Sequence, residues 1–165
     1  MNSSASEGRA PVARDFMATK LITLRPEDDA MDAMRKLLQY RISGAPVVDQ
    51  AGTYLGVFSE KTSMNFLLDA MYEQLPSNEV RAFMNTDPNR TIDEETDLLR
   101  CIQIFKSTEY RRLPVLRDGK LVGQISRRDV LNAAVKLVDT IKSRRNGKFV
   151  MYFSAILDVD QSPVD

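Results

Sequence analysis

Two stretches of the chain carry apolar residues at the spacing of an amphipathic helix. Each stretch follows acidic residues, at 27–29 in the first case and 93–95 in the second. Carboxylates favour the positive end of a helix dipole, so we expect a helix to begin after each acidic segment. The side chains expected on the buried faces are Ala30, Met31, Met34, Leu37 and Leu38 in the first helix, and Leu98, Leu99, Ile102 and Phe105 in the second.

Short apolar runs follow each predicted helix. Residues 45–48 and 54–58 form two such runs around a turn that contains Gly52, and residues 113–116 are followed by an Asp-Gly turn at 118–119. This pattern is typical of β-hairpins, because Asp-Gly readily adopts the backbone angles of a tight hairpin turn. A further helix is expected after each hairpin, at 62–71 and at 129–142. The predicted order in each half is strand, helix, strand, strand, helix.

The two halves repeat each other. The Phe-Met pair at 16–17 returns at 83–84, the segment 45–48 returns at 113–116, and Ser59 returns as Ser126. The spacing from Met to Pro is 29 residues in one copy and 30 in the other. Such agreement indicates an internal duplication of one supersecondary unit, with a period of about 68 residues.

The duplication divides the chain into parts. We expect a disordered leader at 1–10, a first unit at 11–75, a second unit at 76–143 and a C-terminal extension at 144–165. The extension contains an apolar run, 149–157, which is too short to span a membrane and which we expect to pack on the module or in a dimer interface. The predicted fold class is mixed α/β (α+β), with two tandem units.

Composition excludes several functions. The 165 residues include 23 Lys and Arg, 23 Asp and Glu, no histidine and one cysteine. We therefore expect no His or Cys metal site, no Ser-His-Asp triad and no internal disulfide. Cys101 is expected to be a buried structural thiol, since no histidine is present to lower its pKa. No apolar run has the length of a membrane span or the place of a signal core, so we expect a cytoplasmic protein.

The zero net charge hides an asymmetry. Residues 100–148 contain 13 basic and 4 acidic residues, so basic charge gathers in the second half. This charge could bind phosphate, or it could be a solvated dipolar surface, and composition leaves both interpretations open. A nucleic-acid binder is disfavoured, because no aromatic-basic stacking motif accompanies the charge.

The ordered motifs also carry a family resemblance. The segment 39–48 with Gly52 and Gly56, together with 110–115 and 123–129 in the second copy, resembles the cystathionine β-synthase (CBS) domain. The duplication, over residues 12–142, resembles the pair of such domains called a Bateman module. This resemblance implies two units related by a pseudo-twofold axis, with clefts that bind adenosine nucleotides or related ligands. In the family, the Ser/Thr-x-x-Asp turn of one unit meets the first strand and the apolar-Pro-Val segment of the other, and the aspartate binds the ribose hydroxyls.

The resemblance places one ligand site at the turn before the last helix of the second unit. Asp129 follows Ser126 at the family spacing and is the residue expected to bind ribose, although Asp at a helix start is also an ordinary cap. Free backbone N–H groups at a helix start favour a bound anion as well. The implied ligand-binding residues are Thr19, Lys20, Ile22, Ile42, Ser43, Gly44, Ala45, Pro46, Ile125, Ser126, Arg128 and Asp129.

The corresponding turn of the first unit departs from the family pattern. Thr62 stands where the aspartate is expected and carries no charge, and Glu60 adds negative charge beside any phosphate. We expect this cleft to be empty or weaker, although Arg111 and Arg112 could still hold phosphate. Its residues would be Ser59, Thr62, Tyr110, Arg111, Arg112 and Pro114.

Three hypotheses for function follow from this pattern. The first is a stand-alone regulatory module that needs no cofactor, binds AMP, ADP, ATP, S-adenosylmethionine or a dinucleotide, and signals in trans to an unknown protein. The family resemblance also implies a homodimer. The second is a structural or dimerisation module with vestigial clefts, for which Thr62 is the best evidence. An enzyme or a nucleic-acid binder is the least favoured hypothesis.

Overall fold

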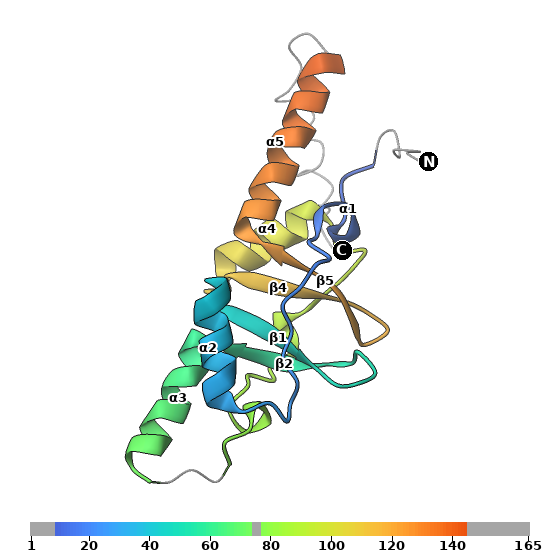
Figure 1. Ribbon diagram of the computed structural model, residues 1–165. Coiled ribbons are helices and arrows are strands. Elements are labelled where there is room, and N and C mark those ends of the chain that lie inside the picture. The colour runs from blue at the N-terminus through green and yellow to red at the C-terminus, as the bar shows by residue number, and fades with distance from the viewer. Residues whose placement is uncertain (1–8, 74–76, 145–165) are drawn as a thin grey trace, which may run out of the picture.

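The computed structural model describes residues 9–73 and 77–144 (Figure 1). The first repeat contains α2 (Ala30–Tyr40), β1 (Gly44–Val48), β2 (Tyr54–Ser59) and α3 (Glu60–Met71). The second contains β3 (Ile92–Asp93), α4 (Leu98–Ser107), β4 (Arg112–Arg117), β5 (Lys120–Ser126) and α5 (Arg127–Arg144). Shorter helices are α1 (Ala13–Phe16), η1 (Val80–Ala82) and η2 (Pro88–Arg90). In Figure 1 the two hairpins lie next to each other, with α2 and α3 beyond one hairpin and α4 and α5 beyond the other, which confirms the mixed α+β class.

Each repeat builds a small sheet from its hairpin and a preceding segment. β1 and β2 pair antiparallel, as do β4 and β5, and β3 runs parallel to β4. Ile92 of β3 pairs with Val115, and Leu24 forms a single parallel bridge with Val47. Leu24 and Ile92 therefore hold equivalent positions. The predicted order of elements is confirmed, with the first strand of the first repeat reduced to this one bridge.

Side-chain caps determine where the helices begin. Asp29 accepts a hydrogen bond from the backbone N of Asp32 at 3.1 Å, and Asp97 accepts one from Arg100 N at 2.8 Å. Asp97, rather than the acidic residues at 93–95, thus caps α4. The helices α3 and α5 begin directly after Ser59 and Ser126, two residues before the predicted starts, because these serines are themselves the caps.

The buried face of α2 is narrower than the apolar pattern predicted. Ala30, Ala33 and Leu37 are buried, whereas Met31 and Leu38 are 38% and 74% exposed. The prediction for Met31 and Leu38 was wrong, because successive residues turn by about 100° and only the i, i+3, i+7 line faces the sheet.

The segment before each repeat packs on the other repeat. Ala18 pairs with Gln124 of β5, and Asn85 pairs with Val57 of β2. Beside these bridges, α1 joins the core of the second repeat and η1 joins the core of the first. Residues 80–85, which we expected in the second unit because they follow the boundary at 75/76, therefore pack on the core of the first repeat.

The tips of the two hairpins are bonded to each other. Asp118 and Gly119 have φ angles of 50° and 75°, as a type I′ turn requires, which confirms the predicted Asp-Gly turn. Tyr54 N donates to Gly119 O at 3.0 Å, and Leu121 N donates to Gly52 O at 3.2 Å. Together with the exchanged segments, these bonds tie the two repeats into one body.

Cys101 lies in the second core with no exposed surface, which confirms that it is a buried thiol. Burial raises its pKa to about 11, so the reactive thiolate is scarce at neutral pH. We expect Cys101 to resist Ellman's reagent in the folded protein and to react fully in concentrated guanidinium. Because the chain has one cysteine, the absorbance change reports this residue alone. Rapid reaction of the native protein would contradict this placement.

The predicted leader, apart from Arg9 and Ala10, and the predicted extension beyond Arg144 lie outside the described residues. The apolar run 149–157 is among these. Within residues 9–73 and 77–144, no helix has the length and apolar character that a membrane crossing requires.

Candidate functional site

Each repeat carries a capping box at the start of its last helix. In α5, Asp129 Oδ2 accepts hydrogen bonds from Ser126 N at 2.7 Å and from Ser126 Oγ at 2.8 Å. In α3, Thr62 Oγ1 accepts one from Ser59 N at 2.8 Å and donates to Ser59 O at 3.0 Å. Both residues thus close the box that stabilises the first turn of their helix.

The two boxes leave different groups for a ligand. Asp129 uses only Oδ2, and its Oδ1 accepts no hydrogen bond from the part of the chain that the structure describes. A carboxylate with a free oxygen can accept hydrogen bonds from two neighbouring hydroxyls. Thr62 is 9% exposed, and its hydroxyl already donates and accepts within the turn. Asp129 therefore combines the cap with spare acceptor capacity, and Thr62 does not.

A cleft of about 950 Å³ opens beside Thr62, and we call it the Thr62 cleft. Its volume falls within the range of small-molecule sites, about 300–1,000 Å³. It brings together five residues predicted for the two sites, Ser43, Ser59, Thr62, Tyr110 and Arg111. Four of these were assigned to the weaker site, so this cleft belongs to the turn that lacks the aspartate.

A small cavity of about 20 Å³ lies between the two hairpins. It is lined by the predicted residues Ser43, Gly44, Arg111, Arg112 and Pro114. Such a volume holds about one water molecule, so this cavity is no nucleotide site. A further cleft, of about 470 Å³, is lined by residues of 88–96 and of α4.

Some residues predicted for the Asp129 site are core residues. Ala45 and Ile125 are 1% and 0% exposed, and Pro46 is buried in β1. Ile42 is partly buried against the first core. Ala45 and Ile125 thus belong to the cores of the first and second repeats.

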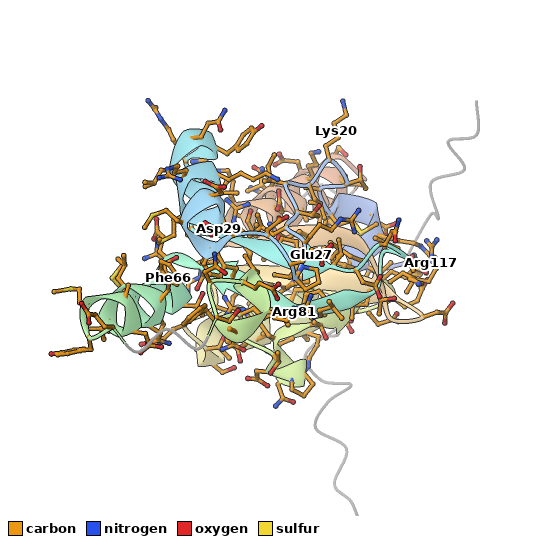
Figure 2. The ribbon with its side chains drawn as sticks, turned by 60° about the horizontal axis from the view of Figure 1, so that its bottom comes forward. Lys20, Glu27, Asp29, Phe66, Arg81 and Arg117 are labelled. Atoms are coloured by element: carbon orange, nitrogen blue, oxygen red, sulfur yellow. The ribbon has the colours of Figure 1, made fainter. Side chains whose placement is uncertain are left out.

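Other residues predicted for that site lie at the surface. Thr19, Lys20 and Arg128 are exposed, and Figure 2 shows Lys20 pointing away from the body of the protein. None of the three cavities above is lined by Thr19, Lys20 or Asp129.

The repeat relates the Thr62 cleft to the Asp129 turn. Leu24 and Ile92 are equivalent, so Ile22 is the counterpart of Arg90, which lines the Thr62 cleft. The counterparts of the lining residues include Ile22, Ile42, Ser43, Ser126, Arg128 and Asp129, and also residues not predicted for a site, such as Arg41 and Asn132. The first six of these were predicted for the Asp129 site, and the make-up of that site stays a prediction.

Sequence reasoning missed Arg90 and Asn85 in the wall of the Thr62 cleft, and it considered Arg127, which also lines this cleft, as a phosphate ligand at the Asp129 turn instead. Arg90 ends η2, and its Cζ lies 5.0 Å from the ring centroid of Tyr110, a cation–π contact. The signal that could have found it is the repeat, because its counterpart Ile22 had been selected.

Polar groups around Arg90 have shifted pKa values. Burial raises the pKa of Tyr54 to about 12, and burial followed by the bond to Asp87 raises that of Tyr110. The backbone N–H of Asn89 holds the pKa of Asp87 below its usual value, and Tyr110 Oη also donates to Asp87 at 2.9 Å. Both tyrosines are therefore neutral and Asp87 is ionised at neutral pH.

No group of three or more His, Cys, Asp or Glu side chains suited to a metal ion occurs within residues 9–73 and 77–144.

Two strand-helix-strand-strand-helix units, each completed by a segment of the other, define a paired module of repeated domains. The family model of the CBS domain matches residues 13–62 and 80–136, and the chain belongs to the CBS domain family.

Related proteins share most of this chain. CBSX1, a chloroplastic CBS domain-containing protein of Arabidopsis thaliana, is 28% identical over 163 residues, which cover 82% of this chain and 69% of that protein. A crystal structure of CBSX2 in complex with AMP has a TM-score of 0.68 and 28% identity, covering 76% of this chain and 97% of that one. The A-adding tRNA nucleotidyltransferase of Aquifex aeolicus is 27% identical over 120 residues, which cover 73% of this chain but 14% of the enzyme.

Proposed function

We propose that this protein is a regulatory module, not an enzyme, that binds an adenine nucleotide or a related adenosyl ligand at the Asp129 turn. The observation that carries the proposal is the free Oδ1 of Asp129 beside the start of α5. That oxygen can accept hydrogen bonds from the ribose hydroxyls, and the free backbone N–H groups at the start of α5 favour binding of a phosphate. The related CBSX2, solved with AMP, supports this ligand class.

The proposed output acts on a second protein in trans. A ligand that contacts both repeats can transmit its presence only if it prefers one arrangement of them over another. The exchanged segments and the bonded hairpin tips are the contacts such a preference would alter. The cytoplasmic location stays a prediction, and the relatives include proteins named as chloroplastic and mitochondrial.

Thermal unfolding tests ligand binding directly. AMP, ADP, ATP and S-adenosylmethionine are added in turn to protein freed of co-purified ligand. A ligand at 100 times its Kd adds about 2.7 kcal/mol to the free energy of unfolding, or roughly 5 to 11 °C in Tm for a chain of this size. A constant Tm with every ligand would contradict the proposal and favour a structural module.

A second proposed role, dimerisation, rests on exposed apolar side chains of the last helix in each repeat. Leu68 and Met71 of α3 are 52% and 80% exposed, and Leu131 and Val135 of α5 are 66% and 58% exposed. Exposed apolar groups of this size favour association. A second copy of the chain, with the same two faces, is the proposed occupant.

Light scattering tests the dimer. We expect the mass of a dimer for the unaltered chain, and of a monomer for the double variant Leu68→Glu, Leu131→Glu. The matched control is Leu38→Glu, which places the same charge on the 74% exposed Leu38 of α2 and should leave the dimer intact. A monomeric unaltered protein, or equal effects of all these changes, would contradict this interface.

A further inference from the structure

Four cationic side chains converge on the Thr62 cleft. The lining cations are Lys61, Arg90, Arg111 and Arg127, and the lining carboxylates are Glu60 and Glu109. Within the described residues, none of the six forms an ion pair within 4.0 Å, although five arginines elsewhere do. Four cations stand against these two carboxylates and the ionised Asp87, which interacts electrostatically with Arg90, so the cleft keeps an excess of positive charge.

Arg90 is the most constrained of these cations. Its Nε is buried and has no hydrogen-bond partner in the part of the chain that the structure describes. Its guanidinium lies over the ring of Tyr110, at the boundary between the Thr62 cleft and the small central cavity. A desolvated donor without an acceptor is unfavourable, and a bound anion would supply the acceptor.

The repeat shows that two of these cations are particular to the Thr62 cleft. Arg90 corresponds to Ile22 and Arg111 to Ser43, so two cations replace uncharged residues of the equivalent site. At the same time, Thr62 stands where the other turn has a carboxylate. Other positions change in the opposite sense, since Glu60 and Glu109 correspond to Arg127 and Arg41. The Thr62 cleft therefore differs from its counterpart in the placement of its cations, with Arg90 and Arg111 beside the small central cavity, and in lacking the carboxylate that would bind ribose.

We propose that the Thr62 cleft binds an oligophosphate through Lys61, Arg90, Arg111 and Arg127, without recognition of a ribose. The proposal covers both a free phosphate chain and the end of a nucleoside triphosphate, because both present the same oxygens to the arginines. The inference rests on the proposed function, since it assigns a different ligand class to the second cleft of the same module. The two clefts then sense different chemistry: a nucleoside at Asp129 and phosphate charge at Thr62.

Calorimetric titration with sodium tripolyphosphate tests the proposal on the full chain. We expect binding of one tripolyphosphate per chain that weakens as salt is added, because screening acts on charge pairs at a partly open site. Arg90→Ile and Arg111→Ser each give the cleft its repeat counterpart and should weaken binding about tenfold or more. Lys136→Ser, a charge removal on the exposed face of α5, is the matched control and should leave the affinity unchanged.

The Asp129→Asn variant separates this proposal from the proposed function. In that background we expect tripolyphosphate binding to persist and ATP to bind with about the same affinity as tripolyphosphate. Circular dichroism checks that each variant is folded, and Arg111→Ser provides the test if Arg90→Ile is not. Unchanged affinity in the folded arginine variants, or ATP binding far more tightly than tripolyphosphate, would overturn the proposal. If AMP fails to bind the unaltered chain while tripolyphosphate binding still depends on Arg90, the proposed function fails and this inference stands.

Discussion

Replacement of Asp129 by Asn is expected to weaken AMP binding by roughly 30- to 150-fold, or about 2 to 3 kcal/mol. The physical reason is the loss of the carboxylate whose Oδ1 is free for a ligand. Asn can still accept the bond from Ser126 N, so the capping box survives and the loss of stability should stay below about 1 kcal/mol. Calorimetric titration with AMP measures the affinity, and thermal unfolding without ligand measures the stability.

The matched control is Asp139→Asn, which makes the same chemical change at an exposed position of the same helix. We expect this variant to bind AMP like the unaltered chain. Two results would count against the role of Asp129: AMP affinity unchanged in Asp129→Asn, or an equal loss in Asp139→Asn. A large loss of stability together with unchanged affinity would show that Asp129 acts only as a helix cap.

Local features of this fold could be predicted from the sequence because each depends on neighbouring residues. The Asp-Gly turn at 118–119, the helix starts near Asp29 and Ser126, and the burial of Cys101 all follow from spacings of a few residues. Met31 and Leu38 show the limit of such reasoning. Apolar character alone did not reveal that they lie beside the face of α2 that packs on the sheet.

The site was predictable only in part, because its wall combines segments that are far apart along the chain. The repeat pointed to Ser59 and Thr62, and the family resemblance to Tyr110 and Arg111, and all four line one cleft. Arg90 escaped because nothing in its immediate neighbours marks it as a ligand residue. Arg90 lines the cleft because residues 80–85 pack on the first repeat, which places the following helix η2 at the boundary between the two units.

Each repeat is crossed by a segment of the other, and this close approach explains why glycine stands at positions 56 and 123. A Cβ added to Gly56 would lie 2.5 Å from the backbone O of Asn85, and one added to Gly123 would lie 3.0 Å from Ala18 O. In each case the segment from the other repeat pairs with the residue that follows the glycine: Asn85 pairs with Val57, and Ala18 pairs with Gln124. The glycines are thus needed for close approach of two backbones, and both have ordinary backbone angles.

Replacement of Gly56 by Ala is therefore expected to destabilise the fold by about 3 kcal/mol, or roughly 6 to 12 °C in Tm. The added methyl group would force apart the backbones joined by Val57 N to Asn85 O, at 2.9 Å, and Asn85 N to Val57 O, at 2.8 Å. Denaturant unfolding followed by circular dichroism measures the change.

Gly123→Ala is the matched comparison, and we expect it to lower the free energy of unfolding by less than Gly56→Ala does. Its nearest obstacle is the flexible side chain of Met17, which can move, whereas the obstacle at Gly56 is backbone that is already paired. The larger loss in Gly56→Ala would show that the close passage of Asn85 over β2 couples the two repeats. A change within about 0.5 kcal/mol of the unaltered chain, the range of ordinary surface substitutions, would mean that this passage is looser than described.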